Sequence, residues 1–278
     1  MIWLVLAILF GFGFIQLFNW SQRRGEYAPV VVTTNYATLS LAVGFYLALN
    51  NNLVFSSDIL KVGMISGVFF VSSMLVMTYA LTIASAAPVI TSFRLSLLLP
   101  VGLGVYIWSE PITSLQIGGI TLAVVALALM TRTKSQNQHL RGLKAFALLI
   151  FIFTIQGITF TCMRWIHYAG LDPQRLNVLC TIGLTAGIVG SLFVLSQKRR
   201  PTKNEILMGT SIGLYNSIAL SIVFTALSIL PGTIYFPTVG CSIVLLDNLF
   251  AHFFWKEKLS RPAIIGVGLA IVAIVLVM

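Results

Sequence analysis

Apolar residues fill most of the chain in long runs, separated by short polar gaps that often contain Pro or Gly. A helix needs about 20 apolar residues to cross a bilayer, because each residue advances it by about 1.5 Å. We identify ten such runs, with approximate ranges 2–20, 28–49, 60–83, 87–108, 112–131, 144–163, 176–196, 206–229, 233–255 and 262–278. The pattern predicts an all-α integral membrane protein with ten transmembrane helices.

The composition agrees with this prediction, since 58% of the 278 residues are hydrophobic and only 9% are charged. A soluble domain of this length could not bury so much apolar surface, so lipid must be the main solvent. The net charge of +10 comes from Lys and Arg in the short gaps, where they meet lipid headgroups and set topology, and we expect no nucleic-acid partner. Cys162, Cys180 and Cys241 lie within apolar runs without metal-ligand spacing, so we expect core residues and no disulfide or metal site.

The start of the chain, "MIWLVLAILFGFGF", lacks the basic segment of a cleavable signal peptide, and we expect it to form the first transmembrane helix. The polar segment "TRTKSQNQHLRG" divides the chain nearly in half. We therefore expect a first unit over residues 1–131, a polar linker over 132–143 and a second unit over 144–278.

The two halves carry an internal repeat. "GITLAVVALALM" (119–130) matches "GVGLAIVAIVLV" (266–277) at six positions with an offset of 147, and the same offset aligns Trp108 with Trp255 and Glu110 with Glu257. Five helices are an odd number, so the second copy must enter the membrane upside down. Two inverted halves that meet in the membrane plane can expose a central site to each side in turn, which is the architecture of alternating access.

These residues also resemble a known family. "WKEKLSRPAIIGVGLAIVAIVLV", preceded by "YFPTVGCSIVLLDNLF", is similar to the end of an EamA-type repeat in the drug/metabolite transporter superfamily, and "TYALTIASAAPVITSFRLSLLLPVGLGVYIWSEPITSLQIGG" in the first half supports the resemblance. It implies a ten-helix transporter, without cofactor, whose cavity is lined by the first, third, fourth, sixth, eighth and ninth helices. Family members move amino acids and other metabolites, sugar phosphates or nucleotide sugars. It implies no catalytic role and a bacterial inner (plasma) membrane location.

One difference from the superfamily's sequence pattern narrows the range of expected solutes. Small multidrug resistance relatives bind cations through a glutamate in the first helix, whereas here that helix offers only Gln16 and Asn19. A lipophilic-cation antiporter is therefore disfavoured. We expect secondary transport of a small polar metabolite, an amino acid or a similar solute, with an anionic solute as an open alternative. A flippase for a lipid-linked substrate is the alternative; an intramembrane enzyme is disfavoured, because no catalytic motif is present. Coupling to protons and a monomeric or homodimeric state stay open.

Polar residues within the cavity-lining helices are the candidate solute-binding residues, since each needs a partner or a water-filled cavity. On the ninth helix, Tyr235, Thr238, Ser242 and His252 fall on one side, a stripe that could line a cavity or form a belt of interhelical hydrogen bonds. The candidates are Arg94, Gln16, Tyr79, Thr91, Gln156, Tyr215, Asn216, Tyr235, Thr238, Asp247 and His252.

Two other features have structural interpretations. Glu110 and Glu257 each precede a helix, with Pro111 or Pro262 in its first turn and Thr113 or Ser260 as a cap, where the positive helix end favours an acid. Gly119 with Ala123, and Gly266 with Ala270, form pairs of small residues that let helices approach closely. We expect them to pack the fifth helix against the tenth.

Arg94 lies near the middle of the fourth helix, and a bare guanidinium there is costly. It could pair with Asp247, which lies at a similar depth in the ninth helix, although the repeat aligns Arg94 near Cys241 and Asp247 lies six residues further, about 120° around the ninth helix. It could instead bind a carboxylate or phosphate of the solute, or snorkel to the surface. The side of the membrane that the termini face also stays open, because the distribution of Lys and Arg and the family resemblance point in opposite directions.

Overall fold

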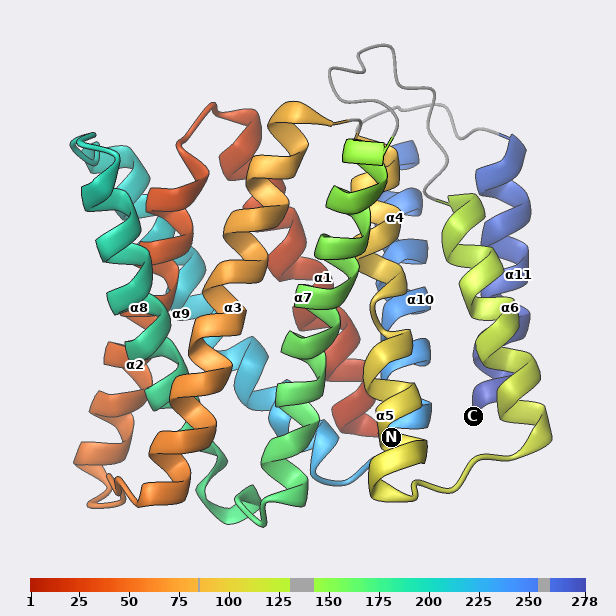
Figure 1. Cartoon of the computed structure of the whole chain (residues 1–278), viewed down its shortest axis with the longest axis horizontal. Helices are drawn as coiled ribbons and strands as arrows, with labels where there is room; N and C mark the ends of the chain where they lie inside the picture. Colours follow the sequence, from red (N-terminus) through yellow and green to blue (C-terminus); the bar gives the residue numbers. More distant parts are fainter. Residues whose placement is uncertain (85, 131–142, 255–260) are drawn as a thin grey trace. The chain divides into compact units, whose positions relative to one another are not determined.

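The computed structural model describes residues 1–84, 86–130, 143–254 and 261–278, and these residues form helices without any strand (Figure 1). One short 3₁₀ helix, Asp172–Gln174, precedes α8. The α-helices are α1 (Ile2–Arg23), α2 (Ala28–Leu49), α3 (Ser57–Ile83), α4 (Ala86–Leu95), α5 (Leu98–Trp108), α6 (Ser114–Met130), α7 (Leu143–Tyr168), α8 (Arg175–Ser196), α9 (Lys203–Leu227), α10 (Gly232–Phe253) and α11 (Arg261–Val277).

Within the described residues, eight spans are long and apolar enough to cross a membrane, and α4 and α5 count together as one of them, Pro88–Trp108. The prediction of an all-α integral membrane protein is therefore confirmed. Two further apolar helices, α6 and α11, are shorter, at 17 residues each. That the chain crosses the membrane ten times, and that its halves form an inverted repeat, stay predictions.

The chain divides into two compact units. Unit 1 consists of Met1–Thr78 and Cys162–Ser228, and unit 2 of Tyr79–Thr161 and Ile229–Met278. Each unit draws helices from both halves of the sequence; two of the three divisions fall within α3 and α7, and the third follows α9. The linker predicted at 132–143, apart from Leu143, lies outside the described residues, as do Trp255, Glu257 and Ser260.

In unit 1, α2 packs against both α8 and α9, and α1 packs against α9. Pairs of glycines four residues apart allow α8 and α9 to approach α2 closely, and α3 to approach α8, because a Cβ atom at each position would lie within 3.3 Å of the neighbouring helix. Leu39, Leu179 and Ile182 are fully buried members of the apolar cluster of this unit. The glycine pairs are Gly63–Gly67 on α3, Gly183–Gly187 on α8 and Gly209–Gly213 on α9.

In unit 2, the most extensive packing joins α6 to α11, and α10 contacts both of them as well as α5. A Cβ atom added at Gly119 would lie 2.8 Å from Val277 Cγ2 and 3.0 Å from the Val277 backbone nitrogen. Ala123 and Ala270 are fully buried. The expected packing of the fifth predicted helix against the tenth through small residues is confirmed.

Candidate functional site

The fourth predicted span is broken in the middle. It was expected to form one helix over 87–108, but α4 ends at Leu95 and α5 begins at Leu98 (Figure 1). Pro100 explains the break, because it has no N–H to donate to the carbonyl of Ser96 and its ring crowds that carbonyl. The Ser96 carbonyl instead accepts from the Leu99 N–H at 3.1 Å, one residue earlier than in an α-helix.

Arg94 lies at the end of α4, directly before this break, and its side chain reaches Asp247 on α10. The distance from Arg94 Nη2 to Asp247 Oδ2 is 3.4 Å, and the two side chains are 16% and 23% exposed. A charge-assisted N–H···O bond is ordinarily about 2.7–2.9 Å long, so this ion pair is loose. It uses one of the five N–H donors of Arg94, and the described residues show no other bond from them.

The structure answers the objection that these two residues lie on different faces. That objection placed Arg94 near Cys241 of α10, with Asp247 six residues further and about 120° around that helix. In the structure the long side chain of Arg94 nevertheless reaches the Asp247 carboxylate, at 3.4 Å. Arg94 and Asp247 therefore meet within unit 2.

Several contacts hold the helices around the pair. Ser92, one turn from the end of α4, donates to the Leu149 carbonyl of α7 at 2.6 Å. At the break, a Cβ atom at Gly240 of α10 would lie 2.8 Å from Leu97 Cδ2. Tertiary contacts thus fix the segment that carries Arg94 on two sides.

Two other candidates in unit 2 carry buried polar atoms that the described residues do not satisfy. Gln156 on α7 is 5% exposed and Thr238 on α10 is 2% exposed, yet neither Gln156 Oε1 nor Thr238 Oγ1 has a hydrogen-bond partner there. The two helices meet nearby through Phe160 and Phe236, whose ring centroids lie 5.6 Å apart. Since an unsatisfied buried polar atom costs about 1–3 kcal/mol, such atoms are expected to bind water or a solute.

The remaining candidates of unit 2 occupy different surroundings. Tyr235 is buried at the start of α10, with its ring edge-on to Phe236, and Thr91 is half-buried on α4. Tyr79 is 62% exposed, and His252 is exposed near the end of α10. The proposed stripe on this helix thus runs from buried residues to an exposed one.

Gln16, Tyr215 and Asn216 belong to unit 1. The side-chain amide of Asn216 donates to Asn35 Oδ1 of α2 at 3.2 Å, and both residues are buried, so this bond ties α9 to α2. Tyr215 stacks on Phe10 of α1 with ring centroids 5.4 Å apart, and Gln16 is half-buried on α1. For Asn216, the hydrogen bond to Asn35 supplies a structural role that the sequence did not indicate.

Glu110 has a structural role, but at a different helix from the one predicted. Its carboxylate is buried and accepts a hydrogen bond at 3.1 Å from the backbone N–H of Thr233, at the start of α10. The helix that follows it, α6, is capped by Thr113 and Gln116, which exchange side-chain and backbone bonds of 3.0 and 3.2 Å. The expected Thr113 cap is confirmed, whereas the acid stabilises the positive end of α10.

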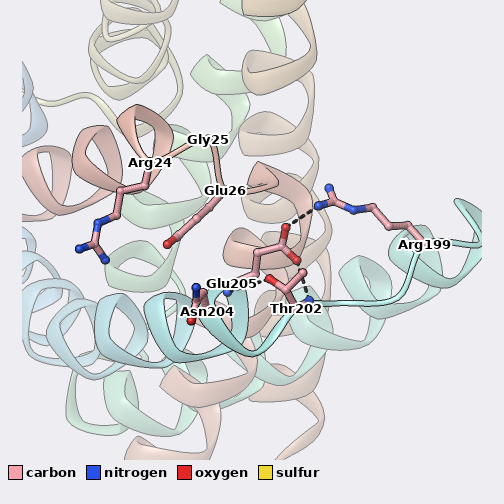
Figure 2. A pocket seen from close by; sticks show the side chains of 7 residues that line it. All are labelled: Arg24, Gly25, Glu26, Arg199, Thr202, Asn204 and Glu205. Atoms are coloured by element: carbon pink, nitrogen blue, oxygen red, sulfur yellow. Dashed lines mark hydrogen bonds and ion pairs between the residues drawn. The ribbon is translucent and has the colours of Figure 1, made fainter.

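A pocket of about 510 Å³ lies at one end of unit 1 between the α1–α2 and α8–α9 loops (Figure 2). Its central group is Glu205, which accepts bonds from Arg199 at 2.6 Å, from the Thr202 N–H at 2.8 Å and from the Tyr27 N–H at 3.2 Å. The guanidinium of Arg199 also covers the Tyr27 ring at 4.2 Å. Because the Glu205 carboxylate bonds to groups of both loops, this polar cluster links the two loops.

Comparison with known proteins supports the fold alone. No family model matches the chain, and no curated protein matches its sequence. Among solved structures, 28 chains match. One of them, described only as the crystal structure of a protein, superposes with a TM-score of 0.78 at 15% sequence identity, and the match covers 99% of this chain and 94% of that chain.

Proposed function

We propose that this chain is a secondary transporter, of the EamA type in the drug/metabolite transporter superfamily, that moves a small zwitterionic metabolite such as an amino acid by alternating access. The observation that carries the proposal is the loose Arg94–Asp247 pair beside a break in a membrane-spanning segment.

Both features are costly within a bilayer. A charged side chain at the centre of a transmembrane helix is unfavourable by about 2.5–3.5 kcal/mol on insertion scales, and ionisable groups at such depths commonly belong to solute pathways. At the break Leu97 keeps right-handed helical dihedrals, but the regular ladder of hydrogen bonds is interrupted and tighter bonds such as Leu99 N–H to the Ser96 carbonyl replace it. Broken helices near the middle of the membrane form the solute sites of many transporters.

The chemistry of the pair matches a zwitterion. The planar guanidinium of Arg94 can bind a carboxylate through two parallel N–H donors, and the Asp247 carboxylate can accept an ammonium group. Without solute, the two side chains neutralise each other at 3.4 Å. With solute, each would exchange its partner for the complementary end of the zwitterion, so neither charge is left uncompensated.

Analogues that lack one charge test this proposal. Purified protein would be screened by thermal unfolding with free amino acids, with their methyl esters, which keep only the ammonium group, and with their N-acetyl forms, which keep only the carboxylate. We expect one or more free amino acids to raise the unfolding temperature and both matched derivatives to lose most of the effect. Equal stabilisation by the N-acetyl form would remove Asp247 from the site, and stabilisation by no free amino acid would reject this solute class.

A further inference from the structure

A second cavity in unit 1, of about 410 Å³, lies between α1, α2, α8 and α9, at residues that the proposed transport site does not use. We call it the Arg175 cavity. Its wall is mainly apolar and includes one charged side chain, Arg175. The lining residues are Trp3, Ala42, Val43, Tyr46, Arg175, Leu176, Ser217, Ile218, Ser221, Ile222 and Thr225.

The cavity runs from the ends of its helices into the apolar layer. Arg175 is the first residue of α8, Trp3 is the second of α1, and Tyr46 and Thr225 lie within one turn of the ends of α2 and α9. Ser217 lies ten residues from the end of α9, which places it about 15 Å deeper. This depth is about half of a 30 Å hydrocarbon core, the thickness of one leaflet.

Arg175 keeps hydrogen-bonding capacity at the mouth. Its Nε donates to Thr225 Oγ1 at 3.1 Å and its Nη1 to the Asp172 carbonyl at 2.9 Å. These are its bonds within the described residues, so three of its five N–H donors are available. No described carboxylate forms an ion pair with it, and Asp172 Oδ2 lies 2.5 Å from His167 Nδ1 instead.

Deeper in the cavity, the hydroxyl groups of the wall already donate hydrogen bonds. The hydroxyls of Ser217, Ser221 and Thr225 each donate to a carbonyl of their own helix, at 2.7, 2.6 and 2.8 Å. Ala42, Val43, Ile218 and Ile222 supply apolar contacts. At the mouth, Trp3 and Tyr46 are the aromatic residue types that favour the membrane–water interface.

We propose that the Arg175 cavity binds one anionic phospholipid, with its phosphate on the guanidinium of Arg175 and part of an acyl chain along the apolar wall. The cavity holds a cation and no acidic side chain, so it complements a phosphate and has no carboxylate to pair with the ammonium group of a zwitterionic headgroup. The length of the wall matches one leaflet. This binding is independent of the proposed solute site.

Lipid-dependent unfolding tests the proposal on the full-length protein, delipidated in a neutral detergent. Phosphatidylglycerol should raise the unfolding temperature on the order of 5 °C more than phosphatidylcholine at saturating lipid. Arg175→Gln should remove most of this difference. Since Arg175→Gln also removes bonds to Thr225 and Asp172, Ser217→Trp provides a second variant that fills the cavity and leaves Arg175 in place. The exposed Arg200, in the α8–α9 loop beyond the opposite end of α8, provides the matched control Arg200→Gln.

The proposal is supported if Arg175→Gln and Ser217→Trp both lose at least half of the preference for phosphatidylglycerol and Arg200→Gln keeps it. It is overturned if phosphatidylcholine stabilises the wild-type protein equally, or if Ser217→Trp keeps the full preference. Stabilisation of the same size by soluble glycerol 3-phosphate would also overturn it, because the acyl chain would then contribute nothing.

Discussion

Replacing both charges of the Arg94–Asp247 pair with apolar residues separates a structural ion pair from a solute site. Arg94→Met keeps an unbranched side chain of related shape, and Asp247→Leu is apolar and somewhat larger. The double variant would be compared with each single variant and with the wild-type protein. The comparison uses stability and transport as independent measurements.

The expected stability changes follow from the geometry. Two unit charges 3.4 Å apart attract each other by about 5 kcal/mol at an effective dielectric constant of about 20. Removing both ions from water costs several kcal/mol each, so the pair contributes little net stability. Removing one partner leaves an uncompensated charge and costs about 3–5 kcal/mol when a pair is fully buried. Because these side chains are 16% and 23% exposed, we expect the lower end of that range.

Thermal unfolding in detergent and uptake into proteoliposomes are the two assays. Each single variant should unfold at a temperature roughly 6 °C or more below wild type, which corresponds to about 3 kcal/mol. The double variant should unfold at or above the wild-type temperature, because no lone charge is left. All three variants should lose transport. A double variant that is stable and transports normally would refute the reasoning, since the pair would then be structural.

Two further variants define what the site requires. Arg94→Lys keeps the charge and loses the planar pair of donors, so transport should fall sharply while the unfolding temperature changes little. In the exchange Arg94→Asp with Asp247→Arg, a stable but inactive protein is expected. Restored expression and transport in the exchanged protein would favour a structural pair.

Three other predictions concern the scaffold and are checked by unfolding temperature. Gly119→Ala should destabilise the protein by about 1–3 kcal/mol, because the added Cβ atom would lie 3.0 Å from the backbone of α11. The control Gly118→Ala places its Cβ atom in open space and should be neutral or stabilising by up to about 1 kcal/mol. Equal effects of the two variants would contradict this packing. Glu110→Ala should cost about 1–3 kcal/mol by uncapping α10, and an unchanged unfolding temperature would argue against the cap. Asn216→Ala should cost about 1–3 kcal/mol by leaving the buried Asn35 without its partner, and replacing both by Leu should restore much of the loss. Normal stability with lost transport in Asn216→Ala would instead place Asn216 on the solute path.

The sequence predicted the helices well because each one needs a long apolar run. The range 28–49 matches α2 at both ends, and most other boundaries differ by only a few residues. The α4–α5 break was missed, although Pro100 inside the fourth run was the signal. The Gly-x-x-x-Gly pairs of α3, α8 and α9 were also readable and indicate close helix packing.

The partners of polar residues were harder to predict, because they depend on how distant helices pack. Glu110 precedes α6 in sequence but caps α10, which a local pattern cannot reveal. Asn216 meets Asn35 across a separation of 181 residues. Arg94 and Asp247 were both singled out as intramembrane charges, and their pairing was one of the alternatives, but whether α4 and α10 bring them together depends on tertiary packing.

Counterflow in proteoliposomes tests the central claim, alternating access for a zwitterionic solute, most directly. Vesicles would be loaded with an unlabelled amino acid that stabilises the protein, and entry of a trace of the labelled compound would be followed over time. For the wild-type protein we predict a transient accumulation of labelled solute above its equilibrium level, because each unlabelled molecule that leaves exposes the site to take up a labelled one. For the double variant Arg94→Met with Asp247→Leu we predict no accumulation. Absence of accumulation with the wild-type protein, or equal accumulation with the double variant, would contradict the account.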